Sequence, residues 1–142
     1  MDGSASDYSK LTLAFHHLKA QWENYATCDS RPELSPLDRD AIRESVIQRF
    51  EITYDVLWKA IKRYMMFTLG LPDIPNSPKP ILRLAYENGM LSKDIAFWLT
   101  IADARVATSH DYSSIKADTC IELIPAFLDA IQPVIRQLEC PE

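Results

Sequence analysis

The stretch that decides the fold runs from residue 42 to residue 69 and reads IRESVIQRFEITYDVLWKAIKRYMMFTL. Apolar side chains recur in it every three or four residues, which is the period of one face of an α-helix. Ser35 and Pro36 precede it and predict where the helix starts, because serine is a favoured N-cap and proline is favoured at the first helical position. Such a helix is roughly 50 Å long at 1.5 Å per residue. We expect it to be the spine of the fold.

The same helix carries a second, weaker apolar line, which consists of Ile52, Val56, Ala60 and Phe67. A helix with two apolar faces lies either in the centre of a bundle or at an interface with another subunit. We therefore predict a homodimer, or a higher homo-oligomer, that uses this helix or the 102–112 region.

The flanking sequence predicts four further helices. An apolar stripe indicates a helix over residues 8–28, and residues 70–80 form a loop because they hold four prolines. A short helix is expected from Pro80 to about Asn88. The last two helices are expected to start after a Ser92 cap and after a break at residues 109–113.

Side chains at helical spacing are expected to face the core from these last two helices. In the first they are Ile95, Trp98, Ala102 and Val106; in the second they are Ile121, Ile124, Phe127 or Leu128, Ile131, Ile135 and Leu138. Pro125 and Pro133 are expected to bend the last helix. The sequence thus predicts an all-α fold, an antiparallel four-helix up-and-down bundle with one extra short helix, as a single domain over residues 1–142.

Composition excludes several classes of protein. The chain has 142 residues, 47% apolar and 25% charged, which is typical of a globular domain and not of a disordered one. Its net charge of −5 argues against a general nucleic-acid coat protein but allows a local pocket for RNA or a nucleotide. Three widely spaced cysteines, no signal peptide and no membrane-spanning run predict a cytoplasmic protein with reduced thiols.

Residues 102–112 read ADARVATSHDY and place Arg105, His110 and Tyr112 where one helix ends and the next begins. On a continuous helix, Arg105 and His110 are rotated about 140° from each other, so they converge only if the helix ends before His110. Serine and threonine residues around His110 favour such a break. One interpretation is a functional pair; the other is a polar helix end, where the dipole stabilises His110.

Two further sets of polar residues have alternative interpretations. Glu51 and Asp55 lie one helical turn apart, and with Arg49 they either brace a pocket around Arg105 and His110 or belong to a charged surface stripe. His16 and His17 are adjacent and point about 100° apart, so they cannot chelate one ion. No metal site, cofactor or glycine-rich phosphate loop is indicated.

The Arg-x4-His-x-Tyr pattern of residues 105–112 resembles the signature of the HEPN superfamily. The helix segment QRFEITYDVLWK at residues 48–59 is similar to that of its HepT-like group, also called nucleotidyltransferase substrate-binding proteins. The resemblance covers roughly residues 8–140 and rests on the combination of the two motifs.

The resemblance implies a dimeric helical bundle that acts as a toxin. Its antitoxin is a minimal nucleotidyltransferase. The resemblance further implies a metal-independent endoribonuclease site with Arg105 and His110 as catalytic residues across the dimer, and a Tyr112 that the partner modifies with AMP. Val106 departs from the polar residue that usually follows the arginine. Two alternatives stay open: a non-catalytic subunit that holds substrate or nucleotide for a nucleotidyltransferase, and a structural helical dimer.

Overall fold

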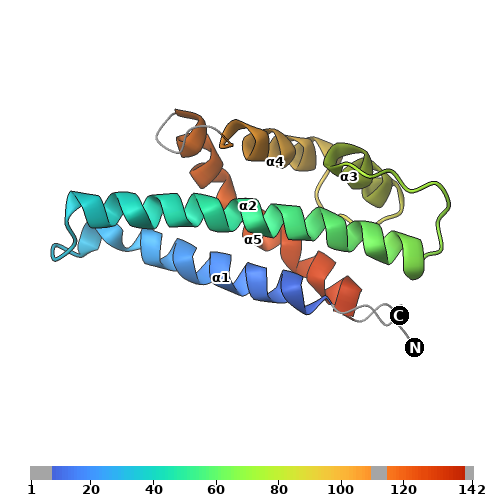
Figure 1. Ribbon diagram of the computed structural model, residues 1–142, viewed down its shortest axis with the longest axis horizontal. Helices are drawn as coiled ribbons and strands as arrows, with labels where there is room; N and C mark the ends of the chain where they lie inside the picture. The colour runs from blue at the N-terminus through green and yellow to red at the C-terminus, as the bar shows by residue number, and fades with distance from the viewer. Residues whose placement is uncertain (1–7, 110–114, 140–142) are drawn as a thin grey trace.

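The computed structural model describes residues 8–109 and 115–139, and all regular structure in these residues is helical. The elements are α1 (Ser9–Ala26), a 3-10 turn η1 (Cys28–Ser30), α2 (Pro36–Phe67), α3 (Pro78–Glu87), α4 (Ile95–Ala107) and α5 (Ile115–Glu139). α1 and α2 lie side by side as an antiparallel pair, α3 and α4 follow one another along α2, and α5 crosses behind (Figure 1). The predicted all-α bundle of four main helices and one short helix is confirmed.

Helix α2 is the longest element, and hydrogen bonds between Ser35 and Asp38 fix its start. The sequence predicted Ser35 as the N-cap. The Asp38 amide donates to Ser35 Oγ at 3.0 Å, and the Ser35 amide donates to Asp38 Oδ2 at 3.0 Å. This reciprocal pair is a capping box. Donation from the Ser35 backbone and side chain lowers the pKa of the Asp38 carboxyl. Over its 32 residues α2 spans about 48 Å.

Three aromatic side chains join α2, α4 and α5 in the centre of the bundle. The Phe50 and Phe127 rings pack edge to face at 5.1 Å between centroids, and Trp98 packs against Phe127 at 6.4 Å. All three side chains are fully buried. Edge-to-face packing is a preferred geometry for aromatic pairs and adds to the stabilisation from burial. The inward positions expected for the last helix are all buried, at Ile121, Ile124, Phe127, Leu128, Ile131, Ile135 and Leu138.

Two details predicted for α4 are wrong. The helix begins at Ile95 with Asp94 as its N-cap, which accepts from the Phe97 amide at 3.0 Å, so Ser92 does not cap it. Val106 is 67% exposed and does not face the core. Trp98 and Ala102 of the expected stripe are buried, and the face of α4 that turns toward the bundle continues through Ile101 and Thr108 instead of Val106.

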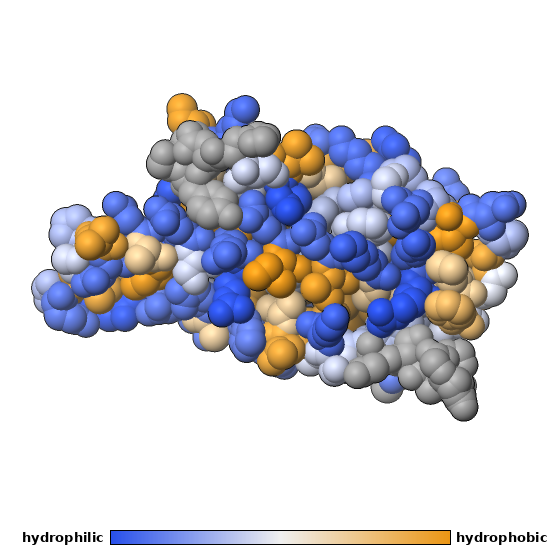
Figure 2. Space-filling model, in the orientation of Figure 1, coloured by the Kyte–Doolittle hydropathy of each residue, from blue (hydrophilic) through white to orange (hydrophobic). Residues whose placement is uncertain are grey.

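The second apolar line of α2 is only partly a surface feature. Ala60 is buried, whereas Ile52 and Phe67 are 43% and 55% exposed. Figure 2 shows apolar surface along the front of the molecule, over the α1–α2 pair, bordered by polar side chains. In the described part of the chain, no helix combines the length and apolar character needed to cross a membrane.

Candidate functional site

Arg105, near the end of α4, is held by two acidic side chains of α2. Its Nε donates to Asp55 Oδ1 at 3.2 Å and its Nη2 donates to Asp55 Oδ2 at 3.1 Å, a bidentate pair. Its Nη1 donates to Glu51 Oε2 at 3.4 Å. Bidentate pairing fixes the plane of a guanidinium as well as its position. Asp55 and Glu51 therefore set the orientation of Arg105.

Thr108 and Ser109 complete this cluster from the end of α4. The fully buried Thr108 hydroxyl donates to Glu51 Oε2 at 2.7 Å, and Arg105 Nη1 donates to Ser109 Oγ at 3.1 Å. Glu51 is itself mostly buried, with 12% of its side chain exposed. Burying a carboxylate is costly unless charged or hydrogen-bonded partners surround it. Thr108 is thus part of what holds Glu51 against Arg105.

The spacing of the polar residues along α2 and α4 lets two side chains of each helix take part in this contact. Glu51 and Asp55 are four residues apart and lie on the same side of α2, while Arg105 and Thr108 are three apart and lie on the same side of α4. Each residue of the α2 pair therefore contacts a residue of the α4 pair: Asp55 contacts Arg105, and Glu51 contacts Thr108. The inward face of α4 thus turns from apolar at Trp98 to polar at Arg105 and Thr108.

A cavity of about 480 Å³ opens beside Arg105. One wall comes from α2 and α4, and the opposite wall comes from the start of α3. The lining residues are Tyr54, Asp55, Ser77, Pro78, Lys79, Pro80, Ala102, Arg105, Val106 and Ser109. Mostly apolar walls with a few placed polar groups are typical of sites for small molecules or nucleotides.

Tyr54 is a site residue that the sequence interpretation did not single out. Burial, together with the neighbouring Asp55 carboxylate, raises the pKa of its hydroxyl to about 12. The phenol therefore stays protonated throughout the physiological pH range and offers a neutral hydrogen-bond donor. It lines the cavity together with Asp55, the next residue of α2.

Not all predicted site residues meet at this cluster. Glu51 and Asp55 contact Arg105 as expected, but Arg49 does not join them: its Nη1 lies 3.3 Å from His17 Nδ1 of α1. Arg49 and Glu51 are two residues apart and so point to different sides of α2. His110 and Tyr112 lie outside the described residues. Among the residues that are described, no three His, Cys, Asp or Glu side chains are arranged to hold a metal ion.

Comparison with known proteins places the chain in a family. A family model described as nucleotidyltransferase substrate binding protein like matches residues 6–140. The chain belongs to this family. The match covers all the described helices, including the Arg105 cluster and the cavity beside it. The family resemblance expected from the two sequence motifs is confirmed.

Relatives of this substrate-binding family agree in sequence and in fold. The chain is 31% identical over 102 residues to a protein named probable ribonuclease HepT from Haemophilus influenzae, covering 70% of this chain and 69% of the relative. A solved structure from Haemophilus influenzae, described as the substrate binding domain of a nucleotidyltransferase, matches with a TM-score of 0.81 at 27% identity, covering 93% of this chain and 98% of the other. A crystal structure from Thermus thermophilus matches with a TM-score of 0.64 at 28% identity, covering 85% and 98%.

Proposed function

We propose that this protein is the HepT-like toxin subunit of a two-gene toxin-antitoxin module and acts as a metal-independent endoribonuclease. Arg105 and His110 are its catalytic residues, and a minimal nucleotidyltransferase is its partner and antitoxin. The observation that carries the proposal is the anchored Arg105: two carboxylates of α2 hold its guanidinium at the wall of a cavity. The naming of the Haemophilus influenzae relative as a probable ribonuclease supports it.

The chemistry of RNA cleavage suits these residue types. When the 2′-hydroxyl of RNA attacks the adjacent phosphate, it loses a proton, the leaving 5′-oxygen gains one, and negative charge builds on the phosphate. Histidine titrates near neutrality and can accept or donate a proton. Arginine carries its charge at any physiological pH, and a guanidinium that is already oriented stabilises the developing charge without reorganising.

The proposed enzyme is a homodimer, because the base and the acid require two histidines and each chain has one in this motif. A two-fold axis brings the same residue of both protomers together. The exposed apolar side chains Ile52 and Phe67 on α2 support an interface there. Light scattering at micromolar concentration is expected to give the mass of a dimer or a larger oligomer, and a monomer contradicts this part of the proposal.

Control is proposed to act through Tyr112, which follows His110 by two residues. Transfer of AMP from ATP to the tyrosine oxygen releases pyrophosphate and leaves a phosphodiester beside the catalytic pair. The added negative charge competes with RNA phosphate for Arg105. Incubation with the neighbouring nucleotidyltransferase, ATP and magnesium is expected to add the mass of AMP, and Tyr112→Phe is expected to prevent this. An unchanged mass with an active nucleotidyltransferase contradicts the proposed control.

A second candidate function is a non-catalytic subunit that holds substrate for the nucleotidyltransferase. Val106 favours it: the side chain is exposed in the cavity wall directly after Arg105, where an apolar group suits contact with a nucleobase and not proton transfer. The solved relative described as a substrate binding domain also favours it.

RNA cleavage in EDTA separates the two functions. The wild-type protein is expected to cut single-stranded RNA and leave 2′,3′-cyclic phosphate ends, and His110→Ala is expected to abolish this without changing thermal stability. Because a contaminating ribonuclease gives the same product ends, His110→Ala prepared identically is the control. Cleavage that persists in His110→Ala contradicts the assignment of the catalytic residue. No cleavage by the wild type, together with nucleotide binding, supports the substrate-holding function.

A further inference from the structure

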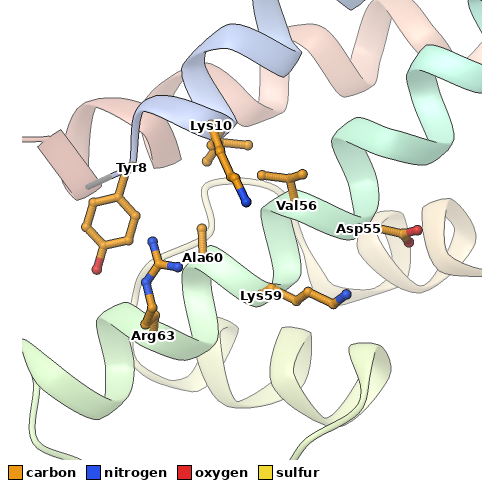
Figure 3. Close-up of a pocket in the computed structure, with 8 residues that line it drawn as sticks. Tyr8, Lys10, Asp55, Val56, Lys59, Ala60 and Arg63 are labelled. Carbon is orange, nitrogen blue, oxygen red and sulfur yellow. The ribbon is translucent and has the colours of Figure 1, made fainter. Parts of the chain in front are cut away.

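A second cavity, of about 220 Å³, lies between the first turn of α1 and the second half of α2, and three basic residues line it. Lys10 and Arg63 extend into the space between the two helices, whereas Lys59 runs along α2 toward Asp55 (Figure 3). Lys10 comes from α1, and Lys59 and Arg63 come from α2. The other lining residues are Tyr8, Leu11, Asp55, Val56 and Ala60. The cavity thus combines three cationic groups with an apolar floor.

The basic groups approach this cavity from both helices. Figure 3 shows Lys10 extending from α1 toward α2 and Arg63 extending from α2 toward α1. Lys59 and Arg63 are four residues apart and share one side of α2. The Arg63 guanidinium lies over the Tyr8 ring at 5.2 Å, a cation–π contact that orients it. The first turn of α1 holds no acidic residue, so the helix dipole adds to the positive potential.

The two lysines of this cavity are not neutralised by acidic neighbours in the described part of the chain, although the Lys59 ammonium lies over the Trp58 ring at 5.8 Å. Neither Lys10 nor Lys59 forms an ion pair with a residue in the ranges 8–109 and 115–139, whereas Lys79 is paired with Asp103. The one acidic residue in the lining, Asp55, uses both carboxylate oxygens on Arg105. Like charges gathered around a cavity repel one another, and a bound anion relieves that repulsion. In a chain of net charge −5, such a cluster is a local feature.

The basic cavity and the cavity beside Arg105 share a lining residue of α2. Asp55 lines both cavities. Arg63 is eight residues beyond Asp55, which is about 12 Å along the helix axis. A free phosphate ion fills one cavity only, whereas the backbone of a nucleic-acid strand carries phosphates at regular intervals and reaches both. The half-buried Val56 side chain in the floor suits contact with ribose or base.

We propose that Lys10, Lys59 and Arg63 form a second phosphate-binding subsite, which holds the backbone of the RNA strand on one side of the Arg105 site. This inference rests on the proposed function, because it names the path of the RNA that the Arg105 site cuts. The subsite binds and positions the strand and takes no part in proton transfer.

The test measures binding of a labelled single-stranded oligoribonucleotide by fluorescence anisotropy. The full chain with His110→Ala serves as the background, so that the RNA stays intact. Lys10→Gln with Lys59→Gln removes two phosphate contacts, which is expected to reduce the slope of log K against log salt by about 1.4 and the affinity by about 25-fold near 0.1 M salt. Lys19→Gln with Lys116→Gln is the matched control for net charge, because both positions are exposed and lie outside this cavity. This control is expected to change neither the affinity for RNA nor the salt slope.

The outcomes separate the subsite from the proposed function. If the His110→Ala protein does not bind RNA at all, both are overturned. If Arg105→Gln weakens RNA binding while the Lys10 and Lys59 substitutions leave affinity and salt slope unchanged, the subsite alone is overturned. If those lysine substitutions leave RNA binding intact but abolish binding of ATP or of the nucleotidyltransferase, the cavity belongs to that other ligand and the subsite is likewise overturned.

Discussion

Replacing Thr108 by valine tests how the polar cluster is held together. Valine has nearly the shape and helix propensity of threonine, so the substitution removes the hydroxyl and little else. The hydroxyl is fully buried and donates to Glu51 Oε2 at 2.7 Å; the Arg105 carbonyl, at 3.1 Å, is its other acceptor. Thr108→Val therefore takes a donor away from a carboxylate that is 12% exposed.

The expected cost follows from the charge on the acceptor. A hydrogen bond to a charged group contributes about 1.5–3 kcal/mol to stability, and little water reaches Glu51 to replace the lost donor. Because Arg105 still contacts Glu51 at 3.4 Å, we expect about 2 kcal/mol. Unfolding entropy of about 2.1 cal/mol/K per residue converts this into a fall in Tm of about 7 °C for a chain of this length.

Thermal and urea unfolding, followed by circular dichroism at one fixed protein concentration, measure this cost. Thr108→Ser is the matched control, because it keeps the hydroxyl and loses one methyl group, which costs about 1 kcal/mol. Valine is expected to be the more destabilising of the two. A valine variant within about 0.5 kcal/mol of wild type, the usual range for surface substitutions, refutes the reasoning, as does a serine variant that is the less stable one.

Three further predictions concern the helix cap, the departure from the family motif and the buried thiol. Ser35→Ala is expected to lower the free energy of unfolding by about 1 kcal/mol. Asp38→Asn is expected to lower it only above the depressed pKa that Asp38 has in the folded protein. The unfolding curves of Asp38→Asn and wild type therefore converge as the pH falls through that value. Val106→Asn is expected to leave Tm unchanged, because the Val106 side chain is exposed. The same variant is expected to raise the rate of RNA cleavage if a polar group after Arg105 assists the reaction. A lower cleavage rate contradicts that role. Burial, together with the nearby Glu51 carboxylate, raises the pKa of the Cys120 thiol to about 12. A thiol reagent at pH 8 is therefore expected to label Cys120 only on unfolding, and rapid labelling of Cys120 in the folded protein argues against the packing of α5 on α2.

The long helices could be predicted from the sequence because each has a regular apolar stripe and a recognisable start. Ser35 and Pro36 placed the start of α2 correctly, and the four-residue spacing of Glu51 and Asp55 placed both on one side of that helix. In these cases the geometry of a single helix is enough, and periodicity describes that geometry fully. The sequence left open whether this side contacts Arg105, which the structure shows that it does.

The errors occurred where the answer depends on how two helices pack. Val106 fits an apolar stripe counted from Ala102, but the rotation of α4 against α2 turns Arg105 and Thr108 inward and leaves Val106 exposed. Arg49 is close to Glu51 in sequence yet faces His17 of α1. The wall that α3 adds to the cavity depends on the path of the preceding loop, which no local pattern describes.

Cleavage by Asp55→Asn tests the central claim most directly, namely that the α2 carboxylates hold Arg105 in position for RNA cleavage. The substitution keeps the shape of the side chain and removes the charge that fixes the guanidinium. Asp40→Asn, an exposed position on the same helix, is the matched control. In EDTA, under single-turnover conditions, we expect Asp55→Asn to reduce the cleavage rate by about 100-fold, the size of effect typical of a misplaced catalytic group, while its Tm stays close to that of the control. A cleavage rate within about 3-fold of wild type would contradict the claim, because a rate loss of only about 0.7 kcal/mol is too small for an anchor of the catalytic cation.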